Sequence, residues 1–236
     1  MVLYDGFGPG QNSLNVLPVT QFGTVIFEEE QSGAVRFSQM VADEESVDYY
    51  LDGNLVVSSL NFQSVTEFQN GDNGLKKIIV TTASDPEDVL VESSITIEPG
   101  TYHTVSLIGT IENLRLVTTT EDYRRISDRA SLVLSPYSIS FGNVEGRVVP
   151  IGTELINSLP LSLVFGSSTR TPILPDSYDI YTTAVGTDDI QAGPFRINMQ
   201  SGGLYRLYFT DQIGGGGPAL ILPGDDLNPL FNLYSE

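Results

Sequence analysis

The fold is decided by the stretch Val47-Asp48-Tyr49-Tyr50-Leu51-Asp52-Gly53-Asn54-Leu55-Val56-Val57. β-Branched and aromatic residues flank Asp52-Gly53, and Val47, Tyr49 and Leu51 alternate onto one face, as in a strand with one buried side. Asp-Gly suits the central positions of a tight hairpin turn, because both positions need a positive φ. The stretch therefore predicts two short antiparallel strands joined by a tight turn.

The same pattern of short apolar strands and polar turns continues on both sides of this hairpin. Turn residues such as Pro99-Gly100 separate the segments, and no helical periodicity is present. Strands at this spacing indicate an antiparallel sandwich or barrel. The predicted strands of this first module cover residues 34–40, 47–51, 54–58, 64–68, 75–82, 89–97, 102–109 and 114–119.

The second half of the chain repeats landmarks of the first. Phe62 and Phe165 lie 103 residues apart, and Tyr102 and Tyr205 have the same spacing. Such a constant offset indicates tandem copies of one module. In the second copy, a longer insert at residues 149–155 stands where the first copy has its Asp-Gly turn.

These landmarks give an all-β fold with two tandem immunoglobulin-like antiparallel β-sandwich domains. The first sandwich covers residues 34–122, and the second, with its apolar C-terminal tail, covers residues 130–236. Residues 120–129 are charged and lack apolar alternation, so they are interpreted as a linker. Residues 1–33 form a short N-terminal segment with strands at 14–17 and 24–27, which pair with each other or with a neighbouring molecule.

Composition limits the classes of function. The chain of 236 residues carries 30 acidic and 11 basic residues, a formal net charge of −19, which argues against nucleic acid and anionic lipid as partners. It contains no Cys, which excludes disulfides and thiolate chemistry. No apolar run approaches the length of a membrane span, and the residues after Met1 do not form a signal peptide.

Three motifs accompany the hairpin at 47–53: Ala34-Val35-Arg36-Phe37, then Ile97-Glu98-Pro99-Gly100-Thr101-Tyr102-His103-Thr104-Val105, then Gly109-Thr110. Together they resemble the bacterial family called domain of unknown function 4397 (DUF4397), often found in tandem. Two features depart from the family pattern. The segment before the hairpin lacks Pro, and the second copy, Val144-Glu145-Gly146-Arg147-Val148, lacks the Asp-Gly turn. The resemblance implies a pair of immunoglobulin-like sandwiches in an exported or envelope protein, and no reaction.

Catalytic residues are not expected. His103 is the only histidine, lies mid-strand without a nucleophile motif nearby, and is predicted at the surface or rim of its strand. The conspicuous tyrosines, Tyr49, Tyr50, Tyr102, Tyr205 and Tyr208, are predicted to be core residues.

Calcium is the one cofactor considered, because it takes oxygen ligands from loop carboxylates. Polar turns are the favoured explanation of the acidic loops, so the expectation is no bound cofactor. The calcium candidates are Asp72, Asp43, Glu45, Asp85 and Asp88.

Three functions follow from the sequence. The leading one is a non-enzymatic cell-envelope or extracellular structural protein of the adhesion type, a subunit of a surface assembly with protein partners or copies of itself. The first alternative is a virion structural or decoration protein. The second is a low-affinity calcium- or carbohydrate-binding module.

Overall fold

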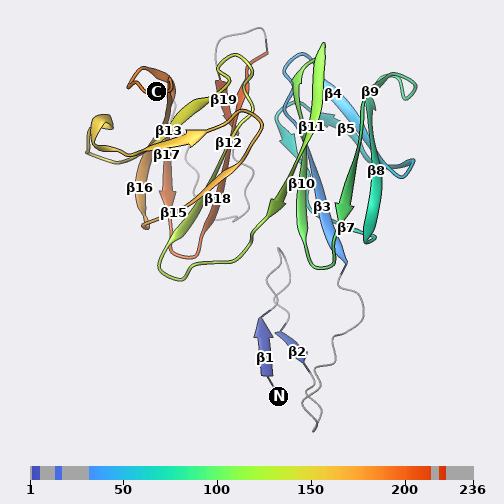
Figure 1. The fold of residues 1–236 in the computed structure, drawn as a ribbon, viewed down its shortest axis with the longest axis horizontal. Coiled ribbons are helices and arrows are strands. Elements are labelled where there is room, and N and C mark those ends of the chain that lie inside the picture. The colour runs from blue at the N-terminus through green and yellow to red at the C-terminus, as the bar shows by residue number, and fades with distance from the viewer. Residues whose placement is uncertain (1, 6–13, 18–31, 214–217, 222–236) are drawn as a thin grey trace.

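The computed structural model describes the backbone of residues 2–5, 14–17, 32–213 and 218–221, and the chain there is all-β. Four sheets form two pairs that stand side by side (Figure 1). Within the described residues, no helix is long and apolar enough to cross a membrane.

The first pair comprises sheet I and sheet II. Sheet I has the order β11-β10-β3-β6, with β7 also paired to β3, and sheet II has the order β5-β4-β8-β9. Their core contains Phe37 and Val105 from sheet I and Tyr49 and Val80 from sheet II. The strands are β3 (Gly33–Gln39), β4 (Ser46–Leu51), β5 (Asn54–Asn61), β6 (Ser64–Val65), β7 (Gln69–Gly71), β8 (Gly74–Thr82), β9 (Val89–Ile97), β10 (Tyr102–Thr110) and β11 (Asn113–Glu121).

The second pair comprises sheet III, with the order β15-β12-β18-β19, and sheet IV, with the order β14-β13-β16-β17. Its core contains Leu132 and Leu207 from sheet III and Val144 and Ile180 from sheet IV. The elements are β12 (Ala130–Pro136), β13 (Val144–Pro150), the 3₁₀ helix η1 (Leu155–Asn157), β14 (Pro160–Leu163), β15 (Thr169–Ile173), β16 (Asp176–Thr183), β17 (Ile190–Met199), β18 (Leu204–Asp211) and β19 (Pro218–Ile221).

The Asp-Gly hairpin forms as its sequence predicts. Leu51 pairs with Asn54 across the turn, and both central residues have positive φ, 50° at Asp52 and 79° at Gly53. A β-bulge nearby, where Ser59 has a φ of 50°, extends β5 beyond the predicted residues 54–58. The turn thus sets the pairing of the residues next to it, and the register of β4 and β5 shifts twice between Tyr50 and Val47.

Each sheet pair contains one parallel strand pair. In sheet I, β3 runs parallel to β10 with Phe37 beside Val105, and in sheet III, β12 runs parallel to β18 with Leu134 beside Leu207. Because these four side chains all face a core, Val105 corresponds to Leu207. The match of Tyr102 with Tyr205 is therefore wrong by one residue, since one step along a strand reverses the face of a side chain.

Sheets I and III face each other at the junction between the two pairs. Met40 and Ile108 from the first pair pack against Tyr137 and Tyr208 from the second, and all four side chains are buried. We call this contact the junction. It leaves sheets II and IV on the two outer sides of the molecule (Figure 1).

The N-terminal strands form a sheet of their own. β1 (Val2–Asp5) pairs antiparallel with β2 (Leu14–Leu17), and neither strand pairs with sheets I to IV. The sequence predicts β2 but misses β1, which lies in a Gly- and Pro-rich lead-in. The predicted strand at 24–27 and the C-terminal tail after residue 221 lie outside the described residues.

Candidate functional site

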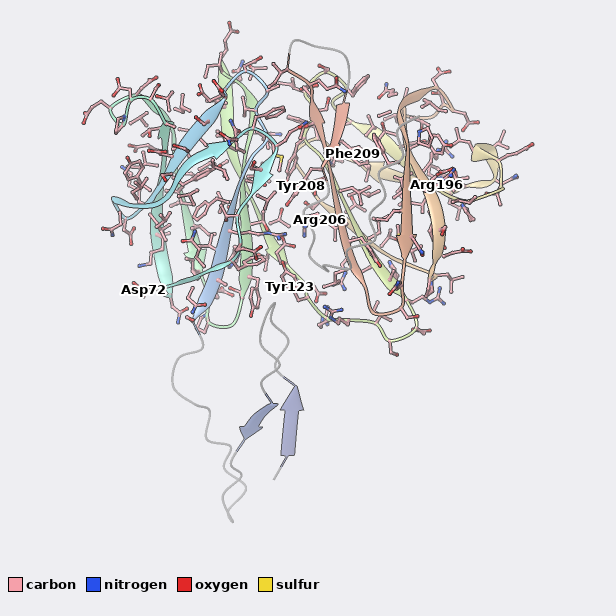
Figure 2. The ribbon with its side chains drawn as sticks, turned by 180° about the vertical axis from the view of Figure 1, so that it is seen from behind. Asp72, Tyr123, Arg196, Arg206, Tyr208 and Phe209 are labelled. Atoms are coloured by element: carbon pink, nitrogen blue, oxygen red, sulfur yellow. The ribbon has the colours of Figure 1, made fainter. Side chains whose placement is uncertain are left out.

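The junction encloses a buried ionic cluster centred on Glu121, the last residue of β11. Arg206 of β18 donates from its guanidinium to one carboxylate oxygen of Glu121. Arg36 of β3 lies 3.6 Å from the other oxygen, and Thr104 of β10 donates its hydroxyl to that same oxygen. Figure 2 shows Arg206 and Tyr208 on the strand that faces the first sheet pair. The three charged side chains are each at most 5% exposed, so two guanidinium groups share one carboxylate away from solvent.

The position of Glu121 corrects the sequence interpretation. The sequence predicts a linker that begins at residue 120, but residues 120 and 121 belong to β11, and the linker contains only residues 122–129. A buried glutamate cannot be told from a surface one by pattern, because its partners come from distant strands. The available sequence signal is the placement of Arg36 and Arg206, since each is the one basic residue within a mostly buried strand.

A second set of polar contacts joins the linker to sheet III. Arg170 of β15 pairs with the Asp122 carboxylate and donates to the Arg124 carbonyl oxygen at 2.7 Å. Hydrogen bonds from the Arg124 side chain hold the pKa of Asp122 at about 2. Arg125 donates to the Gly202 carbonyl oxygen at 3.0 Å. Several of the few basic residues of this acidic chain therefore form internal ion pairs and hydrogen bonds that connect one sheet pair to the other.

The predicted core tyrosines divide into three environments. Tyr49 and Tyr205 lie in the two sheet-pair cores, while Tyr208 is buried in the junction. Tyr50 and Tyr102 are only half-buried. The Tyr208 hydroxyl has no hydrogen-bond partner among the described residues, and burial raises its pKa. The core prediction is therefore confirmed for Tyr49, Tyr205 and Tyr208 and is wrong for Tyr50 and Tyr102, which stay partly exposed.

His103 is buried at 6% exposure, so the prediction of a surface or rim position is wrong. Its Nε2 lies 2.8 Å from the Thr101 hydroxyl and its Nδ1 lies 3.3 Å from the Thr120 hydroxyl. Burial lowers the pKa of His103, against the opposing charges of Glu98 and Glu121. The hydroxyl partners satisfy the ring and provide no nucleophile–base–acid series.

This burial predicts a pH dependence. The unfolded chain binds the His103 proton with a pKa near 6.5, and the folded chain binds it more weakly. Stability from His103 is therefore complete above about pH 6.5 and is lost as the pH falls through the folded pKa. The His103→Gln variant should show a smaller fall in melting temperature between pH 7.5 and pH 5 than the wild type. An equal fall in melting temperature for the two proteins across this pH range would contradict the lowered pKa of His103.

The calcium candidates are scattered over the surface. Asp72 is almost fully exposed, lies 4.0 Å from Lys76, and sits at the end of the first sheet pair away from the junction (Figure 2). Asp43, Glu45, Asp85 and Asp88 are also exposed. Within residues 32–213, no three acidic or histidine side chains gather closely enough to hold a metal ion. Calcium binding by these residues stays an untested expectation.

An exposed apolar loop at residues 151–159 connects β13 to β14 and contains η1; we call it the insert loop. Ile151, Ile156 and Leu159 are 45%, 70% and 85% exposed. The base of the loop is anchored by Arg147, which donates to the Ser158 carbonyl oxygen at 3.1 Å. Arg147 also reaches the β16–β17 connection, where it lies 3.0 Å from Asp188 and 3.2 Å from the Thr187 carbonyl oxygen. The predicted insert is therefore a surface feature that presents apolar side chains on a fixed base.

The second conspicuous surface is the outer edge of β9 in sheet II. No described strand forms a ladder with that edge, and β11 lies near it without backbone pairing. Val91 to Ile97 pair with β8 in unbroken register, and this segment contains no Pro. β9 therefore offers a regular row of backbone groups to a further strand.

Other edges of the described sheets are blunted. β14, β15, β17 and β19 each contain a Pro, at Pro160, Pro172, Pro194 and Pro218. β5 is bulged. β11 packs against the second sheet pair at the junction: Arg115 donates to the Phe165 carbonyl oxygen, Val117 packs against the junction core, and the Thr119 hydroxyl lies 3.3 Å from that of Ser168.

Comparison with known proteins identifies a family for part of the chain. Residues 33–145 match the family model described as Domain of unknown function (DUF4397). The matched segment spans sheets I and II, the linker, β12 and the start of β13. The family resemblance inferred from the sequence motifs is confirmed over this segment. No curated protein matches the chain.

Two solved structures show distant similarity. One is a candidate adhesin from Bacteroides ovatus, with 10% identity, a TM-score of 0.23, and coverage of 85% of this chain and 95% of that chain. The other is a candidate cell adhesion protein from Bacteroides fragilis, with 11% identity, a TM-score of 0.24, and coverage of 100% and 97%.

Proposed function

We propose that this chain, whose residues 33–145 match DUF4397, is a non-enzymatic structural protein of the adhesion type that acts at the cell envelope or outside the cell. Its two sheet pairs are tandem immunoglobulin-like sandwiches, and copies of the chain associate through their N-terminal strands. One observation carries the proposal: the β1–β2 sheet has only two strands and pairs with none of the four sheets.

A two-stranded hairpin is marginally stable in water, and three or more strands or a packing surface are needed to hold it. The β1–β2 sheet also lies apart from both sheet pairs (Figure 1). It therefore supplies backbone groups with which a strand of a neighbouring molecule can pair, so that the neighbour completes the sheet. The junction supports a structural role, because buried ion pairs hold the two sheet pairs together as one rigid unit under force.

The assembly proposal is tested by deleting residues 1–31. We expect light scattering to show that the full chain forms oligomers whose mass grows with protein concentration. The chain beginning at residue 32 should be monomeric and should retain its melting temperature, because both cores start at β3 or later. Equal masses for the two chains at every concentration would contradict the proposal.

The insert loop supports a second function, the capture of another protein at the cell surface. Large apolar side chains that are exposed together on the surface mark sites of interaction with other proteins. We expect the double variant Ile156→Ser/Leu159→Ser to lose at least tenfold in retention on an immobilised mucin, fibrinogen or collagen layer that retains the wild type.

Leu75→Ser is the matched control for the loop variant, because Leu75 is 72% exposed on β8, outside the insert loop. Its retention should equal that of the wild type. Equal losses for the control and the loop variant would show non-specific adsorption. Failure of all three layers to retain the wild type would also argue against this second function.

A further inference from the structure

We propose that the outer edge of β9 is the acceptor for the β1–β2 hairpin of a second copy, so that the hairpin extends sheet II across the contact between molecules. This inference rests on the proposed self-association and names the surface that receives the N-terminal strands. The partner is a second copy of this chain.

The choice of edge follows from the sheets. β9 offers seven residues, Val91 to Ile97, in unbroken antiparallel register with β8. Among the other edges of comparable length, β17 contains a Pro, β5 is bulged, and β11 packs its side chains against the second sheet pair at the junction. Strand addition needs a row of free N–H and C=O groups at regular spacing. Among the described edges that do not face the junction, β9 provides the longest such row.

The donor also fits in length and charge. β1 and β2 have four residues each, so either strand is covered by the seven-residue edge. The two strands carry one charge, Asp5, and the edge carries one, Glu92. A nearly uncharged contact is needed, because two molecules of net charge −19 repel each other elsewhere.

The position of the hairpin favours a second copy over its own β9. Gly33, the first residue of β3, lies against Ile97, since a Cβ on Gly33 would be 2.4 Å from Ile97 Cγ2. The chain therefore enters the first sheet pair at the Ile97 end of β9. The β1–β2 hairpin lies beyond this end of the first sheet pair (Figure 1). A hairpin projecting from the end of one molecule is placed to meet the edge of the next.

The absence of Cys allows a direct test by disulfide trapping. One full-length chain carries Asn15→Cys on β2, and a second chain, distinguished by a mass tag, carries Ser94→Cys on β9. The control replaces the second chain by one with Ser58→Cys, an exposed serine on the bulged edge strand β5. Equimolar mixtures are oxidised gently and separated without reductant.

We expect the Asn15→Cys and Ser94→Cys chains to form a disulfide-linked heterodimer in several-fold higher yield than the control mixture. The yield should rise with salt, because added ions screen the repulsion between two acidic molecules. Equal yields at β9 and β5 would overturn the assignment of β9. A disulfide that forms only within one chain carrying both Asn15→Cys and Ser94→Cys, and never between chains, would show that the hairpin completes its own sheet.

The trapping result separates this inference from the function on which it rests. If oligomers require residues 1–31 but the disulfide forms at β5, self-association holds and β9 is the wrong acceptor. If the full chain is a monomer at all concentrations, both the self-association and its acceptor are wrong.

Discussion

Replacing Glu121 by Ala should destabilise the protein by about 3–5 kcal/mol, because it leaves Arg36 and Arg206 buried without their shared carboxylate. Removing one partner of a buried ionic contact costs far more than the contact adds, since the remaining charge has lost its hydration. Urea unfolding of the two proteins measures the difference. Calorimetry of the variant should also show separate transitions for the two sheet pairs, where the wild type shows one.

Glu92→Ala is the matched control for Glu121→Ala. Glu92 pairs with Lys77 at 2.8 Å, but both side chains are about half exposed, so the expected cost is at most about 1 kcal/mol. A second variant keeps the test informative if Glu121→Ala fails to fold. The triple replacement Arg36→Met, Glu121→Leu and Arg206→Met removes all three charges and should restore most of the stability. Equal costs for Glu121→Ala and Glu92→Ala would contradict the burial of the cluster.

After Glu121→Ala, the replacement Gly109→Ala should lower the stability of the folded protein most. Gly109 is the second-to-last residue of β10 and pairs with Leu114 of β11. It has a φ of +114°, and a Cβ there would lie 2.2 Å from the Asn113 carbonyl oxygen. Backbone strain at a positive φ costs about 1–3 kcal/mol, and the steric overlap adds about 1–3 kcal/mol. The same hairpin places Glu121 in the junction, so its distortion also disturbs the ionic cluster.

Gly74→Ala separates the two contributions to the Gly109→Ala effect. Gly74 has nearly the same φ, +111°, but nothing lies within 4 Å of a Cβ at that position. Its replacement should therefore cost only the strain term. Chemical denaturation of both variants gives the difference, and equal losses of stability would show that the contact with Asn113 has no effect.

The all-β fold and most strands of the first module could be predicted from sequence because their signals are local. Asp52-Gly53 specifies a turn through two adjacent residues, and alternation across β4 specifies its buried face. The tandem alignment was less secure. The alignment of Tyr102 with Tyr205 rests on residue type alone. It pairs a side chain outside the core with a core side chain, because residue type does not tell which face of a strand a side chain occupies.

The candidate site was mostly beyond sequence prediction. Glu121 binds Arg206 across 85 positions of the chain, and His103 is buried against hydroxyl groups, so neither environment is encoded nearby. The insert loop was predicted as an insertion, but the exposure of Ile156 and Leu159 depends on where Arg147 fixes its base. The open edge of β9 is a property of the whole sheet, since every strand needs a known neighbour before a free edge can be recognised.

The most direct measurement of the central claim, that copies of this chain associate into an assembly, is native mass spectrometry of a mixture of isotope-labelled and unlabelled full-length chains. We expect oligomers that contain both kinds of chain, and these mixed species should be absent when residues 1–31 are removed. A spectrum with only the two monomer masses, at concentrations and salt that screen the charge of −19, would contradict it.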